Sequence, residues 1–377
     1  MAFIGDKREK QTAPMEDALE FNADIAVLAD GHGGDKHGLG IATFACQKVM
    51  EHLVVADYDP MDFYETMPKL FAEIHESYLE KMVEPGVVIE NYVPMKDGFN
   101  IRGGTTLTAT VHKKYKGREY IMTANVGDSD VFLFTKKGDK YYAQKLTKTH
   151  KPDSEEEYFR IQKCGHTAAS CVYDTQGVLT SAGQLPIFHD DGTYVDYEPT
   201  YEPYSASIQH YHTLYREFKK AQKMDKITST MEAECEVALH DYKEKKRIYF
   251  ASQDGRRCVS NARNDRATYV MWDAYRPENS LKLSVTRAIG DYYGNLHGIS
   301  PVPDVYVTWL DTEDLGDQAV LFVASDGILD CYELENLAEI VMNCSPATLT
   351  NIFHTQAESF FGSDYDDMSY AMKWIKK

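Results

Sequence analysis

Short apolar runs that end near an aspartate recur along this chain, and they constrain its fold more than any other feature. A single Asp-Gly pair is usually only a turn, because aspartate caps its own backbone and glycine adopts positive φ. Several aspartates at strand ends, however, can converge at one end of a sheet. The runs are 25–29 before Asp30, 120–126 before Asp128, 283–289 before Asp291, 319–324 before Asp326, and 368–375 after Asp366.

The elements between these runs indicate the fold class. Apolar spacing predicts amphipathic helices over 38–55 and 61–82, and a helix over 333–342. Short strands are predicted over 105–112, 120–126, 131–135 and 141–146, joined by glycine-containing turns that suit antiparallel hairpins. Strands and helices therefore occur in separate runs, which favours an α+β fold over alternating βαβ units.

The character of the chain changes over 164–277. This stretch contains a Tyr-rich acidic segment over 190–204 and a single predicted helical run over 205–246. Its basic patch consists of Arg256, Arg257, Arg263 and Arg266.

Composition excludes several classes of function. The 377 residues carry a net charge of −19, which disfavours binding to nucleic acid or acidic membranes. We find no apolar run long enough to span a bilayer, and no apolar leader at the N-terminus. The seven cysteines form no C-x-x-C pair, so reduced thiols in a cytoplasmic or nuclear protein are expected.

The recurring aspartates suggest a metal site. A cluster built from carboxylates alone suits Mg²⁺ or Mn²⁺ better than zinc. Without cations, several packed carboxylates would repel one another strongly. Two such ions close together are a known device for activating water against phosphate esters.

In its ordered motifs the chain resembles the metal-dependent protein phosphatases of the type 2C serine/threonine class. Together the matching segments cover about two-thirds of its length. They are Met15-Glu16-Asp17-Ala18, Asp30-Gly31-His32-Gly33-Gly34, Gly104-Thr105-Thr106, Val126-Gly127-Asp128-Ser129, Leu146-Thr147 with His150-Lys151-Pro152, Glu157 with Arg160-Ile161, the segment from Ser284 to Asp291, the segment from Ser300 to Val305, the segment from Ala324 to Asp330, and Asp366-Asp367-Met368-Ser369.

This resemblance implies a single phosphatase domain over 1–377. Its expected core is a β-sandwich of two antiparallel sheets flanked by α-helices. Two Mg²⁺ or Mn²⁺ ions would activate water, and a third site would be weaker. Glu16 would orient the water, and His32 would act as general acid. The implied metal ligands are Asp17, Asp30, the Gly31 carbonyl, Asp291, Asp326 and Asp366, with Asp128 and Asp291 at the third site.

Two departures from the family pattern stand out. The family usually carries a phosphate-gripping arginine five residues before Asp17, where this chain has Thr12. Candidate replacements are Arg8, Lys10, Arg256 and Arg257. The second departure is length, because 164–277 forms an inserted subdomain in place of a short flap. It either recruits a substrate or protein partner, or its arginines pair with its own acidic segment.

Three functions remain open on these grounds. The first is metal-dependent hydrolysis of phosphoserine and phosphothreonine in protein substrates. The second is a pseudophosphatase that uses the same fold as a binding scaffold. The third is a phosphohydrolase that acts on small molecules. It remains open because the metal-dependent chemistry does not depend on the protein part of a substrate.

Overall fold

The computed structural model describes residues 2–10, 14–33, 35–55, 58–115, 117–173, 179–190, 192, 202–224, 226–252, 261–262, 268–272, 281–311, 315–363 and 365–377. The chain divides into two compact units. The first consists of Met1–Lys151 and Val285–Lys377, and the second of Pro152–Ser284. Thr12 and the four arginines of the basic patch lie outside the described residues.

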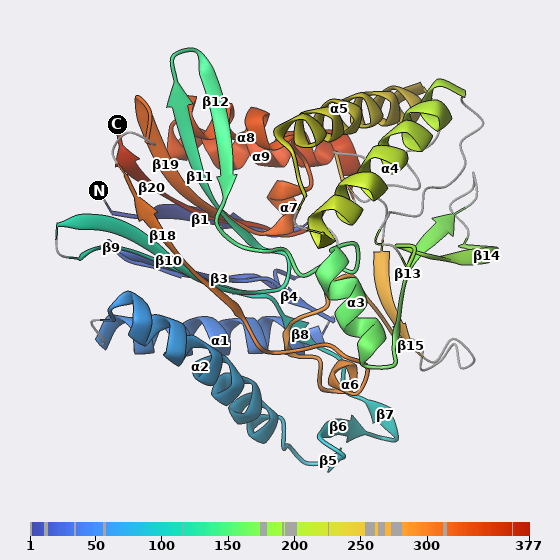
Figure 1. The fold of residues 1–377 in the computed structure, drawn as a ribbon. Coiled ribbons are helices and arrows are strands. Elements are labelled where there is room, and N and C mark those ends of the chain that lie inside the picture. The colour runs from blue at the N-terminus through green and yellow to red at the C-terminus, as the bar shows by residue number, and fades with distance from the viewer. Residues whose placement is uncertain are drawn as a thin grey trace. The chain divides into compact units, whose positions relative to one another are not determined.

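Two antiparallel sheets form the centre of the first unit (Figure 1). Within the described residues each has five strands. The first runs in the order β1 (Ile4–Arg8), β20 (Met368–Lys376), β19 (Gln318–Ala324), β11 (Asp130–Lys137) and β12 (Lys140–Lys145). The second runs in the order β18 (Asp304–Leu310), β10 (Arg118–Val126), β9 (Leu107–Tyr115), β3 (Ile25–Ala29) and β2 (Ala18–Phe21). The predicted sandwich is confirmed.

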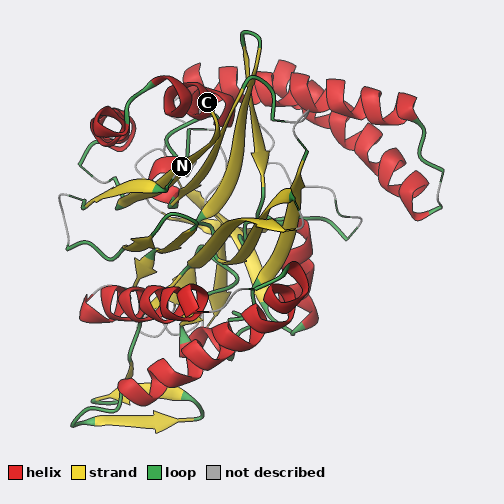
Figure 2. Cartoon of the chain, turned by 90° about the vertical axis from the view of Figure 1, so that its left-hand side faces the viewer, coloured by secondary structure: helices red, strands yellow, loops and turns green. Residues whose placement is uncertain are grey.

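Alternating side chains explain why the sheets stack and carry helices outside. Leu28 in β3 and Leu133 in β11 belong to one buried cluster shared by the two sheets. Their neighbours point the other way: Val27 packs with α1 (Asp35–Val55) and α2 (Pro60–Lys81). Phe132 packs with α8 (Leu334–Asn343) and α9 (Pro346–Phe361). The period of two along a strand thus builds a helix–sheet–sheet–helix stack, seen with the strands in yellow in Figure 2.

The predicted helices over 38–55, 61–82 and 333–342 correspond to α1, α2 and α8. Helix α2 begins sharply because the Asp59 side chain accepts from the amides of Met61 and Asp62, at 2.8 and 3.0 Å. Pro60 occupies its first turn, where no amide is needed. Helix α9 was not predicted, although Ser345-Pro346 is a recognisable helix start.

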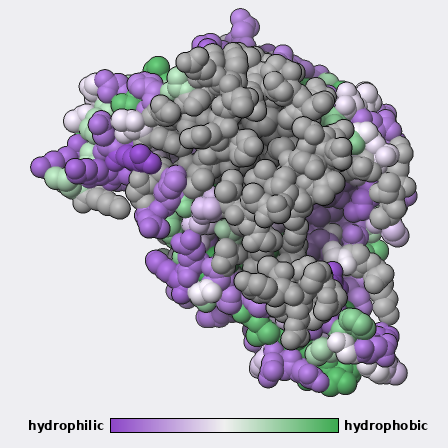
Figure 3. Space-filling model, turned by 90° about the vertical axis from the view of Figure 1, so that its right-hand side faces the viewer, coloured by the Kyte–Doolittle hydropathy of each residue, from purple (hydrophilic) through white to green (hydrophobic). Residues whose placement is uncertain are grey.

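A small meander after α2 was also not predicted. It consists of β5 (Val87–Glu90), β6 (Val93–Lys96) and β7 (Phe99–Asn100). Asn91 and Tyr92 both adopt positive φ in its first turn, as in tight hairpins. Several of its apolar side chains are exposed, among them Val88 and Phe99. Green apolar surface appears beside hydrophilic residues at the lower edge of Figure 3.

The second unit has its own sheet and helices. Its strands run in the order β14 (Leu179–Pro186), β13 (Thr167–Tyr173), β15 (Thr268–Trp272) and β16 (Leu281–Leu283), all antiparallel. Helix α3 (Glu155–Lys163) precedes them. No helix in the described part of either unit is long and apolar enough to cross a membrane.

The prediction of one helix over 205–246 is wrong. The structure has two helices there, α4 (Glu202–Lys223) and α5 (Ser229–Ser252). The Thr228 hydroxyl accepts from the Met231 amide at 3.2 Å and caps the start of α5. The two helices pack against each other, with Tyr211 and Tyr242 stacked at 5.4 Å between ring centroids. The sequence pattern did not separate the two helices.

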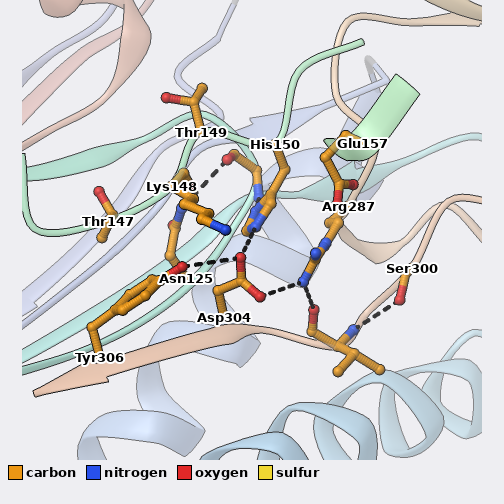
Figure 4. A network of polar contacts seen from close by, with 12 residues as sticks. Asn125, Thr147, Lys148, Thr149, His150, Glu157, Arg287, Ser300, Asp304 and Tyr306 are labelled. Carbon is orange, nitrogen blue, oxygen red and sulfur yellow. Dashed lines mark hydrogen bonds and ion pairs between the residues drawn. The ribbon is translucent and has the colours of Figure 1, made fainter. Parts of the chain in front are cut away.

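A network of polar side chains supports the loops beside the sheets (Figure 4). The Gly127 amide donates to His150 Nδ1 at 3.2 Å, so the ring proton is on Nε2, which lies 3.2 Å from Asp304 Oδ2. Arg287 donates to Asp304 Oδ1 at 3.0 Å. The Thr286 amide donates to the His150 carbonyl at 2.8 Å. The network therefore ties the loop after β10 to the segment that follows β16.

The charge of Asp304 is central to this network. The hydrogen bond from His150 and the Arg287 guanidinium hold the pKa of the Asp304 carboxyl well below its usual range. Such a group stabilises the folded state at every pH above its unfolded pKa, about 4. That contribution is lost as the pH falls towards the lower folded-state pKa.

We predict that Asp304→Asn lowers the free energy of unfolding by about 1–3 kcal/mol at neutral pH, because two charge-assisted hydrogen bonds weaken. Urea unfolding of both proteins should show a gap that narrows below about pH 4. The control is Asp311→Asn, which removes an exposed pair with Arg118 and should change little. A gap that stays constant in acid would contradict the role of the Asp304 charge.

Candidate functional site

Strand register brings the sequence-predicted aspartates to one end of the sandwich. Ala18 pairs with Ala29, so Asp17 and Asp30 extend the same ladder and face each other. Asp128 follows β10, which runs in the same direction as β3 because both are antiparallel to β9. In the other sheet, Asp326 follows β19 and Asp366 precedes its antiparallel neighbour β20.

Three of these carboxylates repel one another. Burial first, and then the nearby Asp366 and Asp367 carboxylates, raise the pKa of Asp17 to about 7. The pKa of Asp30 is raised well above its ordinary value by burial, and then by Asp17, Asp326 and other carboxylates of the cluster. Burial and Asp128 raise the pKa of Asp326 in the same way. Asp17, Asp30 and Asp326 therefore lie in a field of negative charge that neighbouring carboxylates create.

A second set of carboxylates has cationic partners from this chain. Lys10 Nζ lies 3.1 Å from Asp366 Oδ1. Lys151 Nζ lies 3.1 Å from Asp128 Oδ2 and 3.8 Å from Asp330 Oδ2. His32 Nε2 lies 2.6 Å from Asp291 Oδ2.

A three-stranded ribbon places the histidine and its partner. Strand β8 (Gly104–Thr105) pairs with β4 (Gly31–His32) on one side and with β17 (Ile289–Gly290) on the other. His32 and Gly290 therefore both sit opposite Gly104. A Cβ at position 104 would collide with the Asp291 carboxylate, so glycine is needed there for Asp291 to reach His32.

The environment of His32 favours its protonated form. Burial alone would lower the pKa of the imidazole, but the Asp291 carboxylate outweighs burial. Asp128 and Glu16 act in the same direction, and the net result is a raised pKa for His32. Glu16 lies close to the start of α1, since a Cβ at Gly38 would meet its carboxylate.

The donor set suits hard divalent cations. Asp17 is buried, and neither of its carboxylate oxygens has a hydrogen-bond partner among the described residues. A buried carboxylate without a partner is costly, and a cation beside it would remove that cost. In the part of the chain that the structure describes, however, no three acidic, histidine or cysteine side chains form a preassembled metal cage. The ligand types therefore fit Mg²⁺ or Mn²⁺, but their side chains do not converge on one point.

The candidate phosphate-binding cations are placed differently from one another. Arg8 NH1 lies 3.3 Å from Asn351 Oδ1 on α9. Lys10 points into the carboxylate cluster, beside Asp366. Arg256 and Arg257 lie outside the described residues, so the structure does not place them.

Residue-by-residue reading of the sequence missed two supporting groups. Lys151 belongs to the matched segment His150-Lys151-Pro152, yet its contact with Asp128 was not predicted. Asp304 was likewise part of a matched segment, but its link to His150 and Arg287 was not anticipated. The available signal was their position in ordered motifs; which residues they would contact depends on tertiary structure.

Comparison with known proteins identifies the family. The model of the family described as Protein phosphatase 2C matches residues 29–180 and 239–355. The unmatched stretch between these two blocks lies in the second unit. No curated protein matches the chain in sequence.

Two solved structures share the fold. Serine-threonine phosphatase 2C from Toxoplasma gondii is 13% identical with a TM-score of 0.54, and the match covers 99% of this chain and 94% of that one. A sex-determining protein of C. elegans is 16% identical with a TM-score of 0.53; the match covers 99% of this chain but only 64% of that protein. Because the family model matches more than half of the residues, the chain belongs to the protein phosphatase 2C family.

Proposed function

We propose that this protein hydrolyses phosphoserine and phosphothreonine in protein substrates at the acidic end of the sandwich, with two Mg²⁺ or Mn²⁺ ions. The observation that carries the proposal is Asp17, whose buried oxygens have no hydrogen-bond partner among the described residues and whose pKa is raised to about 7. A folded protein gains by binding cations where its own carboxylates repel one another.

The ions would be held by Asp17, Asp30, the Gly31 carbonyl, Asp291, Asp326 and Asp366, and a weaker third ion by Asp128 and Asp291. When bound, such cations supply a water of lowered pKa and neutralise charge on the phosphoryl oxygens. Glu16 borders the cluster, where it would accept a hydrogen bond from that water.

His32 would supply the proton that the leaving oxygen needs. When the phosphorus–oxygen bond breaks, the serine or threonine side chain departs as a strongly basic alkoxide. Asp291 holds the proton on His32 Nε2, so the imidazolium carries a second proton on Nδ1 for the leaving oxygen. The raised pKa of His32 keeps this acid form populated near neutral pH.

Phosphate would be gripped by cations that replace the absent arginine, with Arg8, Lys10, Arg256 and Arg257 as candidates. A guanidinium forms bidentate contacts with phosphate, which an ammonium does not. The second unit, with the inserted subdomain over 164–277, would contribute to choosing the substrate or a protein partner.

A pseudophosphatase is the second candidate. It is favoured by one observation: Lys10 and Lys151 already contact Asp366 and Asp128, two of the implied ligands. Turnover decides between the candidates, because a scaffold binds phosphoprotein without releasing phosphate.

We predict that Asp30→Asn lowers Mn²⁺-dependent phosphopeptide hydrolysis by about 100-fold or more, because an anionic oxygen ligand is lost. In the presence of chelator the same variant should melt at a higher temperature than the wild type. The reason is that a carboxylate whose folded-state pKa is raised destabilises the folded state at pH values above its unfolded pKa, about 4. Phosphate release and thermal unfolding measure the two effects.

The matched control is Asp139→Asn, in the exposed turn between β11 and β12. It should leave both rate and melting temperature unchanged. If the wild-type protein releases no phosphate with either Mg²⁺ or Mn²⁺, the enzymatic proposal is wrong and the scaffold is favoured.

For the acid role, we predict that His32→Gln loses about 100-fold or more in kcat on phosphoserine peptides. It should lose much less on para-nitrophenyl phosphate, whose leaving group needs no proton. His240→Gln, at an exposed position of α5, is the control. Equal losses of kcat on both substrates would contradict the proposal that His32 is the general acid.

A further inference from the structure

Strand β1 carries one residue of the N-terminal segment directly to the acidic cluster. It pairs antiparallel with β20, with Arg8 opposite Met368 and Ile4 opposite Met372. Continued two residues further, the same register puts Lys10 opposite Asp366. The contact between their side chains is therefore a consequence of strand pairing, and the Lys10 ammonium donates to Asp366 Oδ1 at 3.1 Å.

Asp367 fixes the backbone on both sides of this contact. Its carboxylate is buried, with only 2% of the side chain exposed. Its Oδ1 accepts from the Lys10 amide at 2.8 Å, and its Oδ2 accepts from the Glu16 amide at 2.7 Å. One buried carboxylate thus accepts from the backbone amides of both Lys10 and Glu16, and it holds the base of the Lys10 side chain.

The ammonium lies among three carboxylates. Besides Asp366, Lys10 Nζ is 3.7 Å from Glu16 Oε2 and 3.7 Å from Asp367 Oδ2. The Lys10 ammonium therefore lies within 4 Å of three carboxylates. The Lys10 side chain is 18% exposed and Asp366 is 57% exposed, so Asp366 remains accessible to ions from solvent.

We propose that the Lys10 ammonium is an internal counter-cation of the phosphatase site: in the metal-free protein it neutralises charge on Asp366 and Glu16. Lys10 must leave Asp366 before a divalent ion binds there. The proposal rests on the proposed metal site, because it concerns the same carboxylate. One positive charge does not balance three negative ones, so the local field still favours a divalent ion. The competition therefore lowers metal affinity without abolishing it.

Competition has a measurable consequence for binding. A site that is free of its internal cation for about a tenth of the time binds about tenfold more weakly than its intrinsic affinity. We expect Lys10→Gln to bind Mn²⁺ about tenfold more tightly than the wild type in calorimetric titration. Lys10→Arg, which keeps the charge, should bind about as weakly as the wild type. Lys48→Gln removes an exposed lysine that pairs with Glu51 on α1 and is the control for loss of charge alone.

Displacement of Lys10 can also be followed directly, without any activity. A lysine whose Nζ is packed against carboxylates and whose side chain is only 18% exposed presents little of its amine to an acylating reagent, so it reacts slowly. Peptide mapping by mass spectrometry gives the acylation rate of Lys10 relative to Lys48 in the same full-length chain. Saturating Mn²⁺ should increase that ratio severalfold in the wild type.

The outcomes separate this inference from the proposed function. If wild type and Lys10→Gln bind Mn²⁺ equally well, or if Mn²⁺ binds and leaves the acylation ratio unchanged, the competition is overturned while the metal site stands. If neither protein binds Mn²⁺, both proposals fall. Binding by Lys10→Gln but not by the wild type would support the competition in its strongest form.

Discussion

The mutual repulsion of carboxylates at one end of the β-sandwich is the constraint on which the site depends. Asp17, Asp30 and Asp326 all have raised pKa values, and burial is the largest cause for each. These carboxylates therefore lower the free energy of unfolding, because like charges held together in a poorly solvated place oppose folding. The two antiparallel sheets, in which the apolar residues of strands β3 and β19 are buried, keep the aspartates in place despite that repulsion. The arrangement makes chemical sense when external cations share the charge.

Cationic side chains of the chain itself neutralise part of this negative charge. Lys10 contacts Asp366, Lys151 contacts Asp128, and His32 contacts Asp291. These cations differ chemically: a lysine ammonium stands on a flexible side chain, whereas the His32 imidazole is carried by a short strand within a three-stranded ribbon. The acidic end of the sandwich therefore has two kinds of cationic partner, a movable ammonium and a fixed imidazole.

Much of this arrangement was predictable from local sequence. The apolar run before Asp30 is a strand because five consecutive residues are buried between two layers, and the motif order indicated the family. The contact between Lys10 and Asp366 joins residues 356 positions apart and depends on the register of β1 against β20, which no local pattern encodes. The break between α4 and α5 was not predicted from the sequence. Local signals therefore located the aspartates at the strand ends, while long-range pairing determined which side chains they contact.

One backbone detail bears on how such a site changes over evolutionary time. Asp291 adopts a left-handed conformation, with φ 47° and ψ 42°, directly after Gly290 at φ 83°. Apart from glycine, asparagine and aspartate tolerate this region best, so most substitutions at 291 would strain the turn as well as remove the charge. Asparagine keeps both this backbone conformation and the size of the side chain while it removes the charge. A lineage can thus lose the negative charge at this position through one substitution that does not strain the turn.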